Sequence, residues 1–295
     1  MSIPESLLKH IEARLNDEFE INGTLQSGGR ISGGDINTAY SVTYADKRFF
    51  IKLNRINLLQ TFMAEELALN VIKASGSIAC PKGILVAGID EYAYLLLEYM
   101  ELSPQGDDSR LGNALANMHK NSAPLYGWQE DNYIGSTVQL NTQNRNWNEF
   151  WLEMRLRPQL TMAMNNGFQS ELKPIENKLV LAHEFLLRSH KPVPSLLHGD
   201  LWSGNKAFLM SGEPVIFDPA SYYGDRETDI AMTELFGGFG KDFYSAYNAA
   251  WQLPKDYEKR KYIYQLYHML NHLNLFGAGY LHSCLSLTNK IISLG

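Results

Sequence analysis

Residues 196–219 read LLHGDLWSGNKAFLMSGEPVIFDP, and the pattern of this stretch decides the fold. The apolar runs at 207–210 and 215–217 predict two short β-strands, and Ser211-Gly212 predicts the turn between them. A hairpin of this kind brings the loop before its first strand close to the loop after its second strand. We therefore expect polar residues from both loops to meet at one place.

Three polar side chains occupy those two loops. Asp200 lies in a His-Gly-Asp turn, where it could accept a proton from an alcohol, a transfer worth roughly 10²–10⁴-fold in rate. Asn205 offers a neutral oxygen and Asp218 a carboxylate, and such a pair suits Mg²⁺ bound together with phosphate oxygens. A polar turn whose Asp and Asn cap backbone groups is the alternative. The spacing of the whole set favours a phosphoryl-transfer site.

The composition limits the class of protein and its partners. The 295 residues are 45% hydrophobic and 20% charged, which is typical of a globular protein with one large domain or two lobes. The net charge of −6 argues against nucleic acid or an anionic membrane as a partner. Only Cys80 and Cys284 are present, which fits a reducing compartment without a disulfide framework.

The N-terminal sequence MSIPESLLKHIEARL predicts a short surface helix and not a signal peptide, because it lacks a basic start before a long apolar run. No apolar stretch reaches the length of a membrane span. We therefore expect a cytoplasmic protein. A monomer is the default expectation, because no exposed apolar helix demands a partner.

The predicted elements divide the chain into a β-rich front and a helical back. Strands are predicted at 39–44, 48–53, 84–89 and 92–100. Helices are predicted at 58–74, 110–120, 146–166, 171–190, 228–236, 241–250 and 257–284. This order predicts an α+β protein of two lobes, an N-terminal nucleotide-binding lobe (1–102) and a mainly helical C-terminal catalytic and substrate-binding lobe (103–295).

Lys52 is the candidate cation for a nucleotide phosphate. It lies within the strand pattern FFIKL, where its apolar neighbours face the opposite side of the sheet. A lysine in a cleft needs a carboxylate to hold it, and the helix at 58–74 offers Glu65 and Glu66. Adjacent helical residues point about 100° apart, so one of the two faces Lys52. A surface lysine on an edge strand is the alternative.

A glycine-containing loop, SGGRISGGDIN, precedes the Lys52 strand at residues 27–37. Gly33 and Gly34 could let backbone N–H groups approach phosphates. The loop matches neither G-x-G-x-x-G nor the P-loop pattern, so an ordinary loop is the alternative.

The order of glycine loop, strand Lys, helix Glu, HGDxxxxN and Asp resembles the protein-kinase-like fold, with Gly in place of the Arg of H-R-D-x-x-x-x-N. With this glycine, the sequence resembles the small-molecule branch of the fold, which includes aminoglycoside and choline kinases. The string YGWQEDNYIGSTVQLNTQNRNWNEFWLEMRLRPQL at 126–160 resembles fructosamine kinases, also called ketosamine-3-kinases. GGDINTAY, LGNALANMH, HGDLWSGN, DPASYYGDRETDIAM and LYHMLNHLNLFGAGY add to this resemblance, which covers about residues 20–285.

The resemblance implies transfer of the ATP γ-phosphate to the 3-hydroxyl of a ketosamine such as a ribulosamine or fructosamine, which leads to deglycation. ATP and Mg²⁺ are the implied cofactors. The implied roles are Asp200 as catalytic base, Asn205 and Asp218 as Mg²⁺ ligands, Lys52 on ATP phosphate, Glu65 as its partner, and Glu98, Tyr99 and Met100 as the hinge that offers backbone groups to adenine. The preferred sugar and the amine carrier stay open. A kinase of the aminoglycoside or choline type is the alternative, and a pseudokinase ranks below both.

Three further residues are candidates for the substrate site. Trp202 could stack on the sugar, or it could be a packed aromatic that holds the loop. Asp131 and Asn132, in the DNYIG stretch, could line the substrate cleft or brace the catalytic loop.

For four other polar residues, the sequence favours structural roles. We expect Asp229 to cap a helix and anchor the catalytic turn, and His198 to lie hydrogen-bonded beneath that turn. His268 and His272 have the i, i+4 spacing of metal ligands, but their apolar surroundings favour packing.

Overall fold

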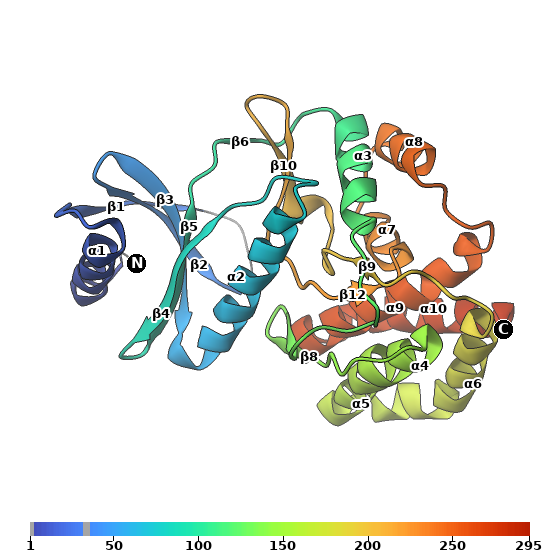
Figure 1. The fold of residues 1–295 in the computed structure, drawn as a ribbon. Helices are drawn as coiled ribbons and strands as arrows, with labels where there is room; N and C mark the ends of the chain where they lie inside the picture. Colours follow the sequence, from blue (N-terminus) through green and yellow to red (C-terminus); the bar gives the residue numbers. More distant parts are fainter. Residues whose placement is uncertain (1–2, 32–35) are drawn as a thin grey trace.

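The protein is described by a computed structural model that covers residues 3–31 and 36–295. A five-stranded antiparallel sheet in the order β1-β2-β3-β5-β4 dominates the N-terminal part. Its strands are β1 Leu25–Ile31, β2 Thr38–Tyr44, β3 Lys47–Arg55, β4 Gly83–Ile89 and β5 Tyr92–Glu98. Two helices accompany the sheet, α1 Glu5–Phe19 and α2 Leu59–Ala74. In Figure 1, α1 lies on the outer side of the sheet and α2 on the side of the helical part.

Strand β5 shows why the sheet needs a helix on each face. Its residues alternate between the two faces, as the pleat of a strand requires. Tyr94 and Leu96 are buried in the cluster that holds the apolar stripe of α1. Leu95 and Leu97 are buried in the larger cluster, which contains α2 and the helical core. The sheet therefore packs against the remainder of the molecule through α2.

The strand β1 corrects the prediction of a loop at 27–37. Residues 25–31 pair with β2, with a register shift between Ser27 and Arg30. The pattern did not reveal this strand, because its residues from 26 to 30 are exposed and an edge strand needs only backbone pairing. The close approach of β1 to β2 also requires a glycine at position 28, since a Cβ there would lie 2.4 Å from the Oγ of Ser41.

The remaining part is mainly helical and forms the second lobe (Figure 1). Its helices are α3 Asp108–His119, α4 Trp147–Trp151, α5 Arg157–Ala163, α6 Gln169–Leu187, α7 Glu227–Thr233, α8 Lys241–Ala250, α9 Tyr257–Phe276 and α10 Leu281–Leu294. The π-helical turns Leu152–Leu156 and Met164–Phe168 join α4, α5 and α6. This arrangement confirms an α+β protein with a β-rich N-terminal lobe. The exact division into 1–102 and 103–295 stays a prediction.

The predicted helix at 257–284 is wrong in its length. The helix α9 ends at Phe276, because Gly277 has φ 86° and ψ −164°, and α10 starts at Leu281. The apolar period continues through both helices, so the pattern alone did not reveal the break.

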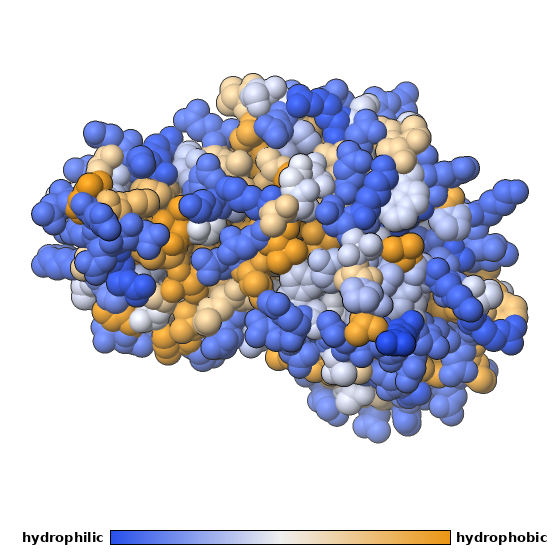
Figure 2. Space-filling model, in the orientation of Figure 1, coloured by the Kyte–Doolittle hydropathy of each residue, from blue (hydrophilic) through white to orange (hydrophobic). Residues whose placement is uncertain are grey.

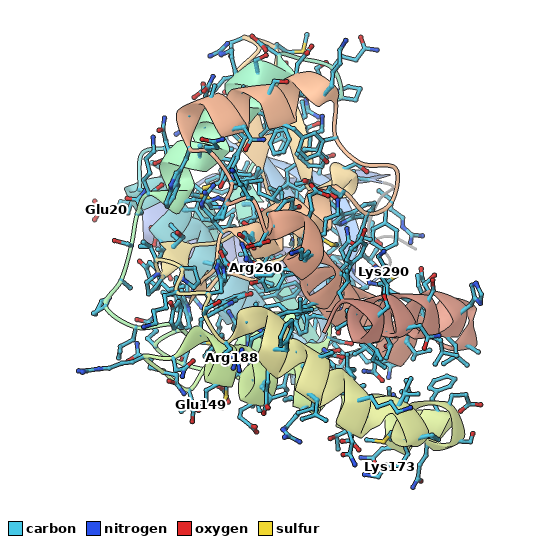
Figure 3. All side chains as sticks on the ribbon, turned by 90° about the vertical axis from the view of Figure 1, so that its right-hand side faces the viewer. Glu20, Glu149, Lys173, Arg188, Arg260 and Lys290 are labelled. Carbon is cyan, nitrogen blue, oxygen red and sulfur yellow. The ribbon has the colours of Figure 1, made fainter. Side chains whose placement is uncertain are left out.

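A buried ion cluster joins α7 to α9 inside the helical lobe. Arg260 (labelled in Figure 3) donates to both carboxylate oxygens of Glu227, at 2.8 and 2.6 Å. Asp225 accepts from His190 at 2.7 Å and from the Tyr264 hydroxyl at 2.6 Å. These side chains satisfy one another's hydrogen-bonding groups, so the cluster stabilises the packing of α7 against α9.

The predicted hairpin is present. Strands β10 Lys206–Leu209 and β11 Pro214–Ile216 pair antiparallel, and β6 Leu102–Ser103 adds to their edge. Two further small sheets were not predicted, β7 Asn132–Ile134 with β8 Thr137–Gln139, and β9 Ser195–Leu196 with β12 Tyr223–Gly224. Strands of two or three residues are too short to show a period. Over the ranges 3–31 and 36–295, no helix is long and apolar enough to cross a lipid bilayer.

Candidate active site

A cleft of about 1000 Å³ lies between the two lobes. The sheet lobe and the hinge contribute Ala39, Phe50, Lys52, Glu65, Leu97, Glu98, Tyr99 and Met100 to its lining. The helical lobe contributes Asn132, Tyr133, Asp200, Trp202, Asn205, Asp218, Phe236, Asn271, His272, Phe276 and Tyr280. In Figure 2, hydrophobic residues gather between the sheet and the helical part, where the two lobes meet.

Lys52 points from β3 into the inner end of this cleft and is 5% exposed. Its ammonium lies 2.5 Å from Oε1 of Glu65 and also forms an ion pair with Asp218. Burial alone would lower the pKa of Lys52, but the carboxylates of Asp218 and Glu65 raise it above the usual value. The lysine is therefore held as a cation.

The choice between the two adjacent glutamates is settled by the helix geometry. Glu65 reaches Lys52, and burial raises the pKa of the Glu65 carboxyl to about 7 against the opposing effect of the ammonium. Glu66 turns the other way along α2, toward Gly83, where a Cβ would lie 2.7 Å from Cγ of Glu66.

The turn that carries Asp200 is fixed by its backbone. The N–H groups of His198 and Gly199 donate to the two carboxylate oxygens of Asp229, at 2.7 and 2.9 Å. Nε2 of His198 lies 3.0 Å from the Phe217 carbonyl oxygen, beneath the turn. The expected anchoring role of Asp229 and the structural role of His198 are therefore confirmed. The expectation that Asp229 caps a helix is wrong, because it lies inside α7, whose N-cap residue is Arg226.

Gly199 is required at this turn for two reasons. Its φ is 86°, in the left-handed region that favours glycine, and a Cβ would lie 2.0 Å from the Ala220 carbonyl oxygen. The close approach lets the Ala220 N–H donate to the His198 carbonyl oxygen at 2.8 Å. The turn and the segment after β11 are thus held against each other.

The Asp200 carboxylate faces the cleft, with 24% of its side chain exposed. Burial raises the pKa of Asp200 to about 7, and the nearby carboxylates of Asp218 and Asp229 act in the same direction. Nδ1 of His268 lies 3.9 Å from Asp200 Oδ1. A carboxylate with a raised pKa in a cleft has the properties of a general base.

Asn205 and Asp218 line the same cleft as Asp200. Nδ2 of Asn205 donates to the Asp200 carbonyl oxygen at 2.9 Å, so its Oδ1 is the atom left for a ligand. Asp218 has φ 59°, a conformation that directs its carboxylate toward Lys52. One amide oxygen and one carboxylate are a donor set that fits Mg²⁺ with nucleotide phosphates.

The predicted hinge follows the end of β5 at Glu98. Glu98, Tyr99 and Met100 all line the cleft. The guanidinium of Arg48 lies 3.8 Å from the centre of the Tyr99 ring, which holds that side chain beside the sheet. Gly33 and Gly34, the predicted phosphate loop, lie outside the described residues.

The far end of the cleft is an aromatic wall, defined by Trp202, Phe236, His272, Phe276 and Tyr280. The rings form a continuous series, with 6.2 Å between the centres of Trp202 and Phe236, and 4.8 Å between Phe236 and His272. Trp202 is 38% exposed, so it faces the cleft. The sequence favoured packing for His272, whereas the structure places it in the lining of the cleft. The i, i+4 run of aromatic residues toward Tyr280 was the available signal.

The two candidates from the DNYIG stretch have bracing contacts. Asp131 is exposed outside the cleft lining, and its Oδ1 accepts from the Asn141 N–H at 2.7 Å. Asn132 is 2% exposed, and its Nδ2 donates to the Ser221 carbonyl oxygen at 2.7 Å. Of the two, only Asn132 reaches the cleft wall, and its amide is already used there.

The model of the fructosamine kinase family matches residues 7–294. A protein named as a probable ketoamine kinase of Vibrio parahaemolyticus is 39% identical over 287 residues, which are 96% of this chain and 98% of that protein. A protein-ribulosamine 3-kinase of Arabidopsis thaliana, named as chloroplastic, is 38% identical and covers 90% of this chain and 82% of its own length.

Solved structures agree with the fold. A crystal structure assigned to a fructosamine-3-kinase of Haemophilus somnus 129PT has a TM-score of 0.87 and 27% identity, and covers 95% of this chain and 96% of that chain. Aminoglycoside phosphotransferase APH(4)-Ia has a TM-score of 0.65 with 13% identity, over 97% of this chain and 99% of its own. The second likeness concerns the fold alone, and it is the fold expected from the HGDxxxxN pattern.

Proposed function

The chain belongs to the fructosamine kinase family, and we propose that it transfers the γ-phosphate of ATP to the 3-hydroxyl of a ketosamine, which leads to deglycation. The observation that carries this proposal is the meeting of Lys52, Asp200, Asn205 and Asp218 in one cleft, next to an aromatic wall. Phosphoryl transfer depends on positioning and on charge stabilisation, and these residues supply both.

The inner end of the cleft suits the nucleotide. Backbone groups of the hinge, Glu98 to Met100, would receive adenine, and Lys52 would hold phosphate oxygens. Glu65 keeps the Lys52 ammonium in place, because it pairs with it at 2.5 Å. Asn205 and Asp218 would hold Mg²⁺, which would supply positive charge to the phosphates.

In the proposed step, the Asp200 carboxylate accepts the proton of the acceptor hydroxyl. The hydroxyl oxygen forms a bond to the γ-phosphorus as the bond to the bridging oxygen of ADP breaks. The raised pKa of Asp200, about 7, suits a base that must take a proton and then release it near neutral pH.

The aromatic wall suits the sugar and its amine. Trp202 would stack on the apolar face of the sugar, with its indole N–H free to donate a hydrogen bond. The neighbouring rings offer negative faces to a cationic amine. The name of the Arabidopsis relative favours a ribulosamine among the possible acceptors, with a fructosamine as the second candidate.

A comparison of acceptors tests the proposal. ADP release from Mg-ATP is measured with ribulosyl-lysine, fructosyl-lysine, kanamycin and choline, and Asp200→Asn is the control variant. Turnover with a ketosamine alone, lost in Asp200→Asn, is the expected result. Turnover with kanamycin or choline would favour a kinase of the aminoglycoside or choline type. Nucleotide binding without any turnover would overturn the assignment as a kinase.

We also propose that the protein acts as a monomer in a reducing compartment such as the cytoplasm. The compartment is supported by the cysteines, since Cys80 and Cys284 are both free and buried.

A further inference from the structure

Among the residues that the structure describes, Arg155 is a buried cation without a carboxylate partner. It lies in the π-helical turn Leu152–Leu156 and is 0% exposed. Over the ranges that the structure describes, no acidic side chain forms an ion pair with it. Its guanidinium lies 4.0 Å from the centre of the Tyr222 ring and donates to the Leu140 and Met154 carbonyl oxygens. Burying an uncompensated charge is costly, so its retention calls for a role.

A chain of side-chain amides leads from this cation toward the active site. The guanidinium NH2 of Arg155 donates to Oδ1 of Asn141 at 2.8 Å. Nδ2 of Asn141 donates to Oδ1 of Asn132 at 2.8 Å, and Nδ2 of Asn132 donates to the Ser221 carbonyl oxygen at 2.7 Å. Beside it, Nε2 of Gln139 donates to Asn132 at 2.8 Å and to the Ala220 carbonyl oxygen at 3.1 Å.

The cation fixes the direction of every hydrogen bond in this chain. A guanidinium has donors and no acceptor, so the amide oxygen of Asn141 must face Arg155 and its nitrogen must face away. Asn132 must then turn its amide oxygen toward the nitrogen of Asn141 and its own nitrogen away from it. The chain therefore ends with an N–H donor aimed at the Ser221 carbonyl. The Tyr267 hydroxyl acts in the same sense, since it donates to Oε1 of Gln139 at 2.7 Å.

The two carbonyl groups held in this way belong to the segment that directly follows Asp218. Ala220 and Ser221 are the second and third residues after it. The same segment is fixed from the other side, where the Ala220 N–H donates to the His198 carbonyl oxygen at 2.8 Å. Asp218 has a left-handed backbone, with φ 59°, which needs such support from its neighbours.

We propose that Arg155 is a positioning residue for phosphoryl transfer. Through Asn141, Asn132 and Gln139 it sets the polarity of the hydrogen bonds that place Asp218 against Lys52 and the nucleotide. The DNYIGSTVQLN signature at 131–141 and Arg155 thus act together as one buried brace. This inference rests on the proposed function, because Asp218 matters through the Mg²⁺-nucleotide that it would hold.

Asn141→Asp separates a positioning role from a structural one. An aspartate at this position would pair with the Arg155 guanidinium and supply the missing counter-ion, so the fold should keep its melting temperature or gain some. It would, however, lose the N–H that donates to Asn132. If polarity is what matters, kcat falls about 10- to 100-fold, the usual range for a residue that orients a metal ligand. The KM for the ketosamine should stay within about twofold, since Asn141 does not line the cleft.

A second readout does not depend on the acceptor. The melting temperature is measured with ADP alone and with ADP plus Mg²⁺ for the wild-type protein, Asn141→Asp and Arg155→Met. We expect both variants to keep the stabilisation by ADP alone and to lose most of the extra stabilisation that Mg²⁺ adds. Arg157→Met, two positions further along the chain, removes a cation whose side chain is 43% exposed, so it is the control for the loss of a positive charge and should behave like the wild type.

Three outcomes decide the question. Wild-type kcat and a wild-type effect of Mg²⁺ in Asn141→Asp would overturn the inference. If Arg155→Met does not fold, Asn141→Asp still decides it, because that variant keeps the cation. If the wild-type protein turns over no acceptor, the proposed function fails, but the Mg²⁺-dependent melting shift still tests the brace.

Discussion

The two loops that meet in the active site are anchored by opposite charges. The turn with Asp200 presents backbone N–H groups to the interior, and the Asp229 carboxylate accepts from two of them, at 2.7 and 2.9 Å. The segment after Asp218 presents carbonyl groups instead, and amides that end on the Arg155 guanidinium donate to them. The sign of the buried charge therefore follows from which backbone group the loop turns inward.

The two anchors also differ in how they are completed. Asp229 is supported by side chains, since Nε2 of His119 lies 3.1 Å from it and Nδ1 of His119 lies 2.7 Å from the Tyr247 hydroxyl. Although burial acts against it, the hydrogen bond from His119 keeps the pKa of Asp229 below its usual value. Arg155 is supported by aromatic rings and carbonyl groups. An anion here acts directly on the backbone, whereas the cation acts through intervening amides.

Removal of the anionic anchor should have the largest effect. Asp229→Ala leaves two buried N–H groups and His119 without their acceptor. We expect a loss of about 3–5 kcal/mol in the free energy of unfolding, the range for breaking a buried charged pair. Urea denaturation followed by circular dichroism measures it.

Asp242→Ala, which removes an exposed carboxylate on α8, is the control and should change stability by less than about 0.5 kcal/mol. A similar small change in Asp229→Ala would mean that the turn does not depend on this carboxylate.

The contact between the two loops can be broken by a substitution that keeps both Asp229 and Arg155 in the chain. In Gly199→Ala, the new Cβ would lie 2.0 Å from the Ala220 carbonyl oxygen, and the residue would keep a φ of 86°. Overpacking and a left-handed backbone each cost about 1–3 kcal/mol, so we expect a loss of about 3 kcal/mol together with most of the activity.

Gly279→Ala is the control for this substitution, because a Cβ there would have no heavy atom of the described residues within 4 Å, apart from its chain neighbours. Thermal unfolding of both variants checks the prediction. Equal melting temperatures would argue that the two loops move independently.

Two tyrosines allow the anchors to be compared by the loss of one hydroxyl each. Tyr247→Phe removes a partner of His119 and of the charged Arg226 guanidinium, whereas Tyr267→Phe removes a partner of two neutral amides, Gln139 and Gln159. Each unsatisfied buried group costs about 1–3 kcal/mol, so Tyr247→Phe should be the more destabilising variant. Chemical denaturation of the pair measures the order. The reverse order would show that the amide chain carries more of the stability than the anionic anchor.

A histidine outside both anchors gives the smallest expected effect. Neither ring nitrogen of His183 has a hydrogen-bond partner among the described residues, and burial lowers the pKa of His183 from 6.5 to about 4. His183 therefore takes up a proton at a lower pH in the folded state than in the unfolded state. The contribution of the neutral imidazole to the free energy of unfolding is complete above pH 6.5 and is lost as the pH falls toward 4. At pH 5.5 the loss is about 1.4 kcal/mol.

Unfolding of the wild-type protein and of His183→Leu at pH 7 and pH 5.5 tests this effect. The leucine variant cannot be protonated, so its stability should fall less between the two pH values. Parallel decreases in both proteins would exclude His183 as a source of the pH dependence.

The sequence predicted the parts of the site that depend on local geometry. Asn205 binds back to Asp200 across 5 positions, and a short hairpin returns the chain to Asp218, so strand and turn signals were sufficient. The alternation of side chains along β3, which predicted that Lys52 faces the cleft, is also a local feature. The brace could not be predicted in this way, because Asn132 and Ser221 are 89 positions apart and Gln139 and Ala220 are 81 apart. Which amides meet across such distances depends on the tertiary packing.

The aromatic wall provides the protein with its own optical reporter. Of the five tryptophans, Trp202 is 38% exposed at the cleft, while Trp128, Trp147 and Trp151 are at most 5% exposed. Acrylamide should therefore quench Trp202 far more than these buried indoles. An acceptor stacked on that ring would shield it, so the intrinsic fluorescence would follow occupancy of the cleft without any label.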